Sequence, residues 1–306
     1  MLPVIARYRF DFFAIDPVGL PQFAGSAMRG VFGHSLKDTV CVTRQKQCSD
    51  CPLRQQCVYT QLFETGLFVD SATATQPLII DSHGLQRNYA SREGFAIELT
   101  LMGVAIAHLP SVIHAWRRAG QRGLGKQQAR FRLRALSQLD MDSMSWRLLL
   151  NEGEDEPVLP VMPTVPAMSG QGVKIKLSTP YRSKLGGHLL KPQDFSAQGF
   201  LASLVHRIAN LQALHCPDQP TLDIEALLRA TAACEMSEVS LQWQKWQRFS
   251  SRQKTHMQLD GIVGEFSLRG GGLNVLAPLL TLGQWLHAGK NTLFGLGRYR
   301  LRSNNA

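Results

Sequence analysis

The order of extended and helical patterns along the chain is the feature that most limits its fold. Apolar and polar residues alternate in part over the first predicted strand, and apolar residues recur every three or four positions in the helix that follows. In chain order we predict a strand, a helix, two strands, a helix and a strand, at residues 4–13, 22–37, 77–80, 95–104, 109–118 and 129–135. This is the order of elements in one small α+β domain.

The second half of the chain shows the same kinds of pattern. Its predicted elements are a strand, two helices, two strands, a helix and a strand, at residues 173–178, 196–214, 226–233, 237–248, 257–268, 275–287 and 292–301. An irregular, acidic and proline-containing segment over 141–170 separates the halves and is typical of a linker. We therefore predict an α+β fold of two tandem ferredoxin-like (RRM-like) domains, residues 1–140 and 171–306.

Charge and composition restrict the partners of the chain. Its 306 residues suit two domains of ~100–200 residues each, and 44% hydrophobic with 18% charged residues is typical of a globular protein. Lys and Arg outnumber Asp and Glu by 33 to 23, and the formal charge of +10 favours a polyanionic partner. No apolar run has transmembrane length, and the N-terminus lacks the layout of a signal peptide. We expect a cytoplasmic protein that binds nucleic acid and no membrane.

The first predicted helix carries glycines on the face opposite its apolar residues. Gly30 and Gly33 each cost the helix roughly 0.8–1 kcal/mol relative to alanine, so the bare surface they create should serve a purpose. Arg29, His34 and Lys37 border this surface. Either a phosphate–sugar chain approaches it closely, or a neighbouring element of the fold packs tightly against it.

Four cysteines fall within a short polar segment. Cys41, Cys48, Cys51 and Cys57 have the spacing C-x6-C-x2-C-x5-C, inside an insertion at about 38–75 in the first domain. A segment with so few apolar residues cannot build its own core, so a structural zinc bound by four thiolates would explain its folding. The alternatives are that the segment binds no metal or that it holds an iron–sulfur cluster. Four thiolates leave no open coordination position, so a catalytic role for the metal is not expected.

Glycines and cations are concentrated where the last predicted helix meets the last predicted strand. Glycine lets a backbone approach a ligand closely and adopt positive φ, and neighbouring cations suit phosphate. The residues concerned are Gly289, Lys290, Gly295, Gly297, Arg298 and Arg300. We interpret this stretch as a contact for a nucleic-acid backbone.

Five stretches of the sequence, taken in order, carry a family resemblance. They are Met28-Arg-Gly-Val-Phe-Gly-His-Ser-Leu36, Cys48-Ser-Asp-Cys-Pro-Leu-Arg-Gln-Gln-Cys-Val-Tyr59 with Leu62-Phe-Glu64, Thr179-Pro-Tyr-Arg182, Leu259-Asp-Gly-Ile-Val-Gly-Glu-Phe266 and Leu286-His-Ala-Gly-Lys-Asn-Thr-Leu-Phe-Gly-Leu-Gly-Arg-Tyr299. The chain resembles the CRISPR-associated endoribonucleases of the RAMP superfamily, which cut precursor CRISPR RNA within its repeats. The resemblance implies tandem ferredoxin-like domains, a stem-loop repeat RNA as substrate, other CRISPR effector-complex subunits as further partners, and cleavage that needs no metal or other cofactor.

Cleavage of RNA without a metal requires a base for the 2′-hydroxyl, an acid for the leaving 5′-oxygen and a cation for the phosphorane. The products are a 2′,3′-cyclic phosphate and a 5′-hydroxyl. His34 is the first candidate, because it resembles the histidine that the family commonly carries on its first helix. His287 is the second candidate. It either transfers a proton or caps and positions the glycine-rich stretch, and the sequence favours neither role over the other. Lys290 is the candidate cation.

The predicted RNA contacts are cations and glycines from both halves of the chain. They are Arg29, Lys126, Arg130, Arg132, Arg182, Arg207, Gly289, Gly295, Gly297, Arg298 and Arg300. For any one of the arginines, a solvated basic surface is the alternative. Two other functions stay open: a non-catalytic RAMP subunit that holds guide RNA, and a zinc-dependent single-strand-binding module with no link to CRISPR.

Overall fold

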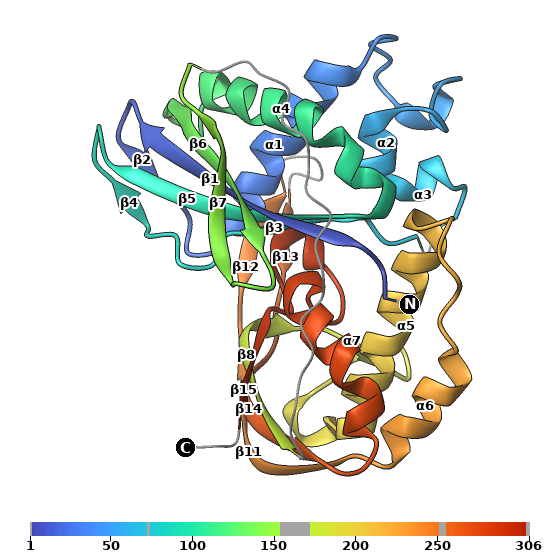
Figure 1. Ribbon diagram of the computed structural model, residues 1–306. Helices are drawn as coiled ribbons and strands as arrows, with labels where there is room; N and C mark the ends of the chain where they lie inside the picture. Colours follow the sequence, from blue (N-terminus) through green and yellow to red (C-terminus); the bar gives the residue numbers. More distant parts are fainter. Residues whose placement is uncertain (1, 72–73, 154–171, 251–254, 304–306) are drawn as a thin grey trace. The chain divides into compact units, whose positions relative to one another are not determined.

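The fold comes from a computed structural model that describes residues 2–71, 74–153, 172–250 and 255–303 (Figure 1). Internal contacts divide the chain into two units. The first unit consists of Pro3–Thr164 together with Ala213–Asp218. The second unit consists of Met1–Leu2, Val165–Gln212 and Gln219–Ala306.

The first unit is built on a five-stranded antiparallel sheet with the strand order β3-β5-β1-β6-β7. Its strands are β1 (Ile5–Ala14), β3 (Leu78–Asp81), β5 (Gly94–Met102), β6 (Phe131–Asp140) and β7 (Ser145–Asn151). Its two long helices are α1 (Ala24–Val40) and α4 (Leu109–Arg122). The shorter elements are β2 (Val18–Gly19), β4 (Asn88–Tyr89), η1 (Cys48–Asp50), α2 (Val58–Leu62), α3 (Thr65–Phe68) and η2 (Gly103–His108).

The core of the first unit lies between the sheet and the two long helices. Alternate residues of β1 share one face of the strand, and Phe10 and Phe12 from that face pack against Trp116 of α4. Phe32 of α1 lies 4.8 Å from the Trp116 ring, centroid to centroid. All four rings are almost completely buried, so this aromatic cluster fixes both helices on one face of the sheet.

The opposite face of β1 carries a buried ion pair. Arg7 is 1% exposed, and its guanidinium donates to Asp81 of β3 at 2.7 Å. The same guanidinium donates to Glu98 of β5 and, at 3.1 Å, to the hydroxyl of Thr100. A buried cation with this many acceptors ties three neighbouring strands together.

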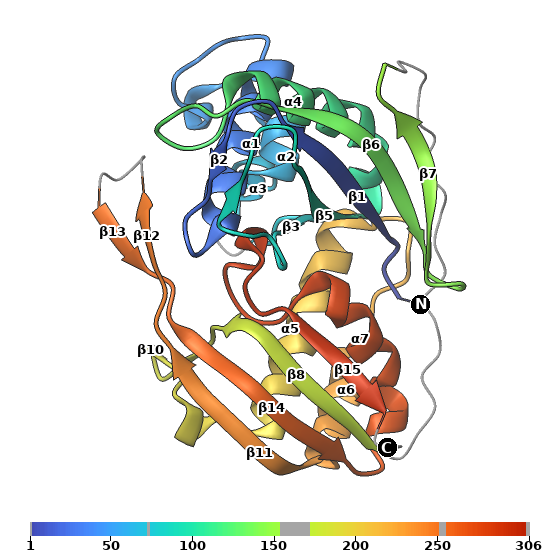
Figure 2. The same ribbon diagram turned by 90° about the vertical axis from the view of Figure 1, so that its left-hand side faces the viewer.

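The second unit contains a four-stranded antiparallel sheet with the order β11-β14-β8-β15. Its strands are β8 (Gly172–Tyr181), β11 (Glu235–Gln244), β14 (Gly261–Arg269) and β15 (Tyr299–Ser303), with helices α5 (Ala197–His215), α6 (Ile224–Ala232) and α7 (Leu273–Leu286). Figure 2 shows these helices on one face of the sheet and the hairpin β12–β13 extending beyond β11 and β14. The remaining elements are β9 (Lys184–Leu185), β10 (His188–Leu189), β12 (Gln247–Ser250), β13 (Thr255–Gln258), η3 (Pro192–Asp194) and η4 (Thr292–Phe294).

The predicted fold class is confirmed. Each unit contains the order strand, helix, two strands, helix and strand, with α6 as an additional helix in the second unit. In each antiparallel sheet the first strand is an inner strand, as in a ferredoxin-like domain. β7 lies within the segment 141–170 for which the sequence predicts a linker, and residues 154–171 of that segment lie outside the described residues. Among the described residues, no helix combines the length and hydropathy that crossing a bilayer requires.

One predicted strand begins later than expected. The sequence predicts extended structure over 292–301, whereas β15 starts at Tyr299. Residues Thr292–Phe294 form a 3-10 turn, and Asn291, Gly295 and Gly297 have φ values of 63°, 84° and 69°. Positive φ is incompatible with an extended strand, so the glycine-rich stretch is a folded loop.

Candidate functional site

His34 lies on the solvent-facing side of α1, and its side chain is exposed. Atoms packed around the ring still remove enough water to lower the pKa of His34 below its ordinary value of 6.5. Arg122, at the end of α4, lowers this pKa further, with contributions from Arg29 and Lys37, and Asp38 acts in the opposite direction. The imidazole is therefore largely neutral at neutral pH and can accept a proton.

The two glycines of α1 differ in their surroundings. A Cβ on Gly33 would lie 2.3 Å from the ring of Phe63, so tight packing within the first unit accounts for this glycine. A Cβ on Gly30 would meet nothing within 4 Å, so the surface at this turn of the helix is open. Arg29 stacks over the Phe63 ring at 4.3 Å. Tight packing by a neighbouring element therefore explains Gly33. At Gly30 the helix surface stays open, as an approaching phosphate–sugar chain would need.

A basic pocket lies at the C-terminal end of α1, on the helix that carries His34. It is lined by Lys37, Asp38, Cys41, Arg44, Gln45 and Arg118. Arg122 donates to Asp38 at 2.9 Å. The sequence places Lys37 near His34, but Arg44 and Arg118 come from separate segments that meet only when α4 packs beside α1. The one signal in the sequence is that both helices carry basic residues in their last turns.

The predicted contacts Arg130, just before β6, and Arg132, on β6, have acidic partners. The Arg130 guanidinium lies 2.9 Å from Asp16, and Arg132 lies 2.7 Å from Glu152. Both pairs are largely exposed, and exposed ion pairs stabilise a fold by only ~0–1 kcal/mol. Either arginine can therefore exchange its carboxylate for a phosphate at small cost. Lys126 is exposed in the turn after α4.

His287 occupies a different position from the one that proton transfer requires. It follows α7 with φ of 56°, its side chain is 0% exposed, and Nδ1 lies 3.2 Å from the carbonyl of Leu296. A ring enclosed in this way has no access to an RNA hydroxyl. The other interpretation, a histidine that positions the glycine-rich loop, agrees with this geometry.

The glycines of the loop are explained by the path of the chain. A Cβ on Gly289 would lie 2.4 Å from the carbonyl of Arg182, and one on Gly297 would lie 1.7 Å from the carbonyl of Ala288. Gly295 is buried and caps η4 in the left-handed region. These glycines let the loop close on itself and on the end of β8, so close approach to RNA is not needed to explain them. Lys290 is exposed at the edge of this loop.

The prediction of an RNA contact at Arg207 is corrected by its burial. The side chain is 9% exposed, and its guanidinium donates to the carbonyls of Leu286 and His287 at 3.0–3.2 Å. Burial lowers the pKa of Arg207 to about 10. The helical pattern predicts an exposed side for α5, but it does not show that this long side chain reaches the last carbonyls of α7. Arg207 therefore stabilises the end of α7 from which the loop begins.

The open face of the second sheet carries a basic strip of Lys174, Lys176, Arg300 and Arg302. Arg300 pairs with Lys176 and Arg302 with Lys174 in the β15–β8 register, and paired residues share a face. Glu265 of β14 lies 3.4 Å from Lys174 and 3.2 Å from Lys176. The sequence predicts Arg300 but not the other three cations. Strand pairing is what brings the two lysines of β8 beside the two arginines of β15.

Two further predicted arginines of the second unit take part in its internal structure. Arg182, at the end of β8, donates through Nη1 to the carbonyl of Asp260 at 2.5 Å, and its own carbonyl accepts from the Lys290 amide at 2.8 Å. Burial lowers the pKa of Arg182. Arg298 is half-buried and its amide donates to Thr179.

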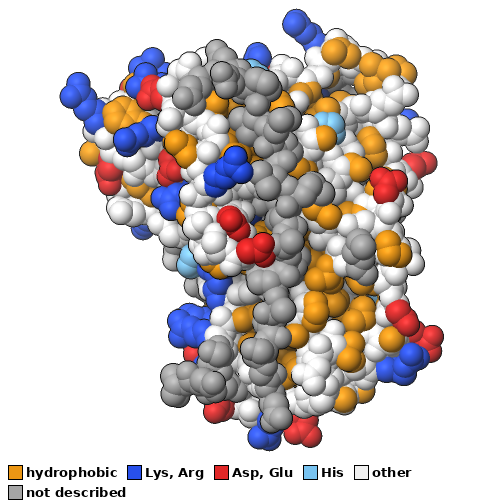
Figure 3. Space-filling view, viewed as in Figure 1, with side chains coloured by type: hydrophobic (Ala, Val, Ile, Leu, Met, Phe, Trp, Pro, Cys, Tyr) orange, Lys and Arg blue, Asp and Glu red, His pale blue; other side chains and the backbone are white. Residues whose placement is uncertain are grey.

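Figure 3 shows Lys and Arg side chains at several separate places on one face of the molecule.

The open face of the first sheet holds a polar pocket that the sequence does not predict. Its charged and polar lining residues include Arg9, Asp11, His83, Gln86, Arg134 and Asn151. They come from three strands and the loop between β3 and β4, so no local pattern could reveal them. Arg9 and Asp11 form an ion pair at 2.9 Å.

Comparisons with known proteins agree with this fold. Residues 2–161 match the family model of the AF_1859_N N-terminal domain, and residues 175–299 match that of the CRISPR-associated endoribonuclease Cas6. An uncharacterized protein of Archaeoglobus fulgidus is 22% identical over 288 residues, which are 93% of each chain.

Solved Cas6 structures are similar over nearly the whole chain. A Cas6 product complex gives a TM-score of 0.59 at 16% identity, with 98% of this chain and 99% of that chain covered. A Thermus thermophilus Cas6 gives 0.54 at 13% identity, with 99% and 100% covered. A partial Cas6-RT-Cas1–Cas2 complex gives 0.60 at 13% identity, with 99% of this chain but 47% of that chain covered.

The two ferredoxin-like units and the two family matches define a CRISPR-associated protein of the RNA-processing class. The resemblance found in the sequence is confirmed. Residues 175–299 belong to the Cas6 endoribonuclease domain family, and residues 2–161 belong to the AF_1859_N domain family.

Proposed function

We propose that the protein cuts precursor CRISPR RNA within its repeats by acid–base chemistry without a catalytic metal, in the cytoplasm, as part of defence against viruses and plasmids. His34 is the observation that carries this proposal. It is an exposed imidazole with a lowered pKa, on a helix face bordered by Arg29, Lys37 and Arg122. A neutral imidazole next to cations can take a proton while the cations hold the phosphate.

His34 acts as the base in this reaction. Its neutral ring removes the proton of the 2′-hydroxyl, the 2′-oxygen forms a bond to the neighbouring phosphorus, and the bond from phosphorus to the 5′-oxygen breaks. The departing 5′-oxygen takes up a proton from water, which leaves a 2′,3′-cyclic phosphate and a 5′-hydroxyl. Nearby cations stabilise the extra negative charge of the phosphorane.

Cations on both units supply the affinity for RNA. In the first unit these are the basic pocket with the exposed Arg130 and Arg132, and in the second unit Lys290 and the basic strip. A stem-loop repeat would be bound mainly through its phosphates and its shape, so affinity should fall with rising salt. A similar Cas6 chain is part of a complex with RT, Cas1 and Cas2, which supports CRISPR proteins as further partners.

The test is to incubate the protein with its repeat RNA in EDTA and to identify the product ends by mass spectrometry. We expect cleavage at one position, a 2′,3′-cyclic phosphate on the upstream fragment, and no cleavage when the nucleotide at the cut carries a 2′-deoxy sugar. Cleavage that needs added Mg²⁺, or that survives the 2′-deoxy substitution, would contradict the mechanism.

Tight binding of the repeat without cleavage would instead support the alternative, a non-catalytic RAMP subunit that holds guide RNA. One observation favours this alternative: His287 is enclosed, so only one of the two predicted histidines reaches solvent. The family match leaves no support for a single-strand-binding module unrelated to CRISPR.

A further inference from the structure

The four cysteines of residues 41–57 line a single pocket in the first unit. Each lies at the boundary of a helical element, where the backbone is held by hydrogen bonds. Cys41 follows α1 and its amide donates to Lys37 at 2.9 Å, whereas the Cys51 amide donates to the carbonyl of Cys48 at 3.3 Å and closes η1. Cys57 is the N-cap of α2. The backbone positions of all four cysteines are therefore set by the fold.

Two of the thiols approach the same hydroxyl. Thr43 Oγ1 lies 3.4 Å from Cys51 Sγ and 3.9 Å from Cys41 Sγ. All four cysteines are free thiols. Within the described part of the chain, no three possible ligands yet converge on one point, so binding a metal would require the thiols to rotate into the pocket.

The segment that carries these cysteines buries almost nothing. Over residues 41–57 only Cys51 is buried, and the apolar side chains of Val42 and Leu53 are 79% and 41% exposed. Apolar burial therefore contributes little to its stability. A structural metal is the usual means by which such small polar segments fold.

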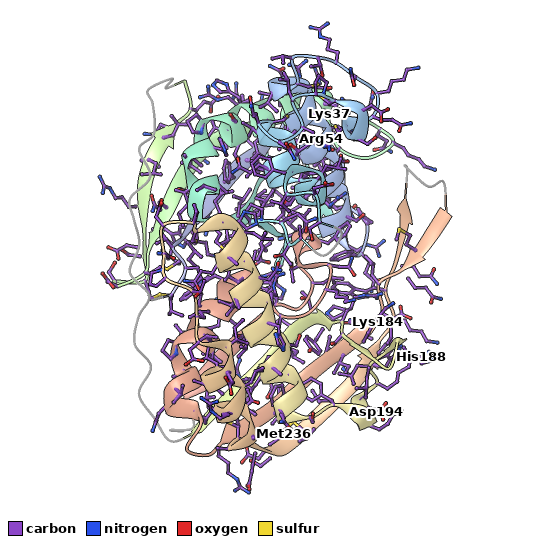
Figure 4. All side chains as sticks on the ribbon, turned by 90° about the vertical axis from the view of Figure 1, so that its right-hand side faces the viewer. Lys37, Arg54, Lys184, His188, Asp194 and Met236 are labelled. Atoms are coloured by element: carbon purple, nitrogen blue, oxygen red, sulfur yellow. The ribbon has the colours of Figure 1, made fainter. Side chains whose placement is uncertain are left out.

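The charge around the pocket suits a tetrathiolate centre. One Zn²⁺ with four thiolates carries two negative charges. Lys37 and Arg54 both line the pocket, and Figure 4 shows these two side chains in the same part of the first unit. Their two positive charges would offset the charge of the centre.

We propose that Cys41, Cys48, Cys51 and Cys57 together bind one structural Zn²⁺. The zinc pocket shares Cys41 and Lys37 with the basic pocket, whose Arg44 comes from the same segment. Zinc would therefore hold Arg44 at the wall of the basic pocket. That pocket lies at the C-terminal end of α1, the helix that carries His34. In this way the metal supports RNA binding and takes no part in the chemistry.

The proposal is tested on the full chain, without RNA, by measuring metal content after reconstitution with Zn²⁺ under reducing conditions. We expect about one tightly bound zinc per chain. Cys51→Ser and Cys57→Ser should each lose this zinc and lower the melting temperature. Cys216→Ser, which changes a buried cysteine of the same unit outside the segment, should keep it.

A second measurement covers the possibility that the serine variants fail to fold. Substitution with Co²⁺ in the unaltered protein should give the strong thiolate charge-transfer absorption and the d–d bands of a tetrahedral thiolate site. Absence of stoichiometric zinc together with absence of these bands would overturn the proposal. Iron with acid-labile sulfide would overturn the identity of the metal. Because the readout is metal content, failure here would leave the proposed RNA cleavage untouched.

Discussion

At the scale of single residues, the properties of His34 depend on the charges that surround it. Desolvation and Arg122 lower its pKa, and Asp38, which forms an ion pair with Arg122 at 2.9 Å, opposes them. A base works only when unprotonated, so the cleavage rate should fall as the pH drops through this lowered pKa. In the proposed mechanism, the balance of these charges therefore fixes the acidic limit of activity.

Arg122→Gln should move that limit to higher pH. Removing the cation stabilises the imidazolium and also releases Asp38, and both effects raise the pKa of His34. The measurement is the pH profile of single-turnover cleavage at saturating protein. Arg229→Gln is the matched control, since it also breaks an exposed ion pair but lies on α6 of the second unit. An unchanged acidic limb in Arg122→Gln would refute the assignment of this limb to His34.

At the scale of elements, helices and strands could be predicted because each repeats its apolar pattern over many residues. The pattern places α1, α4, α5 and α7 within a few residues of their observed bounds. The last strand was predicted too early, because Thr292–Phe294 reads as apolar strand while the positive φ values around it produce a turn. Conformation at such positions depends on what the loop packs against.

The contacts of long side chains were the other feature that the sequence could not predict. Helical periodicity gives the direction of Arg207 from α5, but not the position of α7, whose carbonyls its guanidinium contacts. In the same way, the basic strip and the basic pocket join residues that are distant in sequence. Arg29, His34 and Lys37 could be predicted as neighbours because all three belong to α1.

Arg207→Ala should destabilise the protein by about 2–4 kcal/mol, because two carbonyls at the end of α7 lose a buried charged donor. Urea unfolding measures this loss. His206→Ala is the control, since His206 is the adjacent residue of α5 and is exposed. Equal stability of the two variants would show that the buried hydrogen bonds of Arg207 do not hold the loop in place.

At the scale of the whole molecule, binding and chemistry are distributed differently. The formal charge of +10 is carried by basic groups on both units, so many residues share the affinity for RNA and no single one dominates it. In the proposed mechanism the chemistry depends on one exposed imidazole, that of His34. A change at His34 should therefore affect the rate far more than the affinity.

The most direct test is single-turnover cleavage of the repeat RNA by His34→Ala, measured beside its affinity for the same RNA. We predict that the rate falls by ~10²–10⁴, as for other lost general bases, while the dissociation constant stays nearly the same. His114→Ala, which removes an exposed histidine of α4, should leave both unchanged. If His34→Ala cleaves as fast as the unaltered protein, the central claim that His34 carries out the chemistry is wrong.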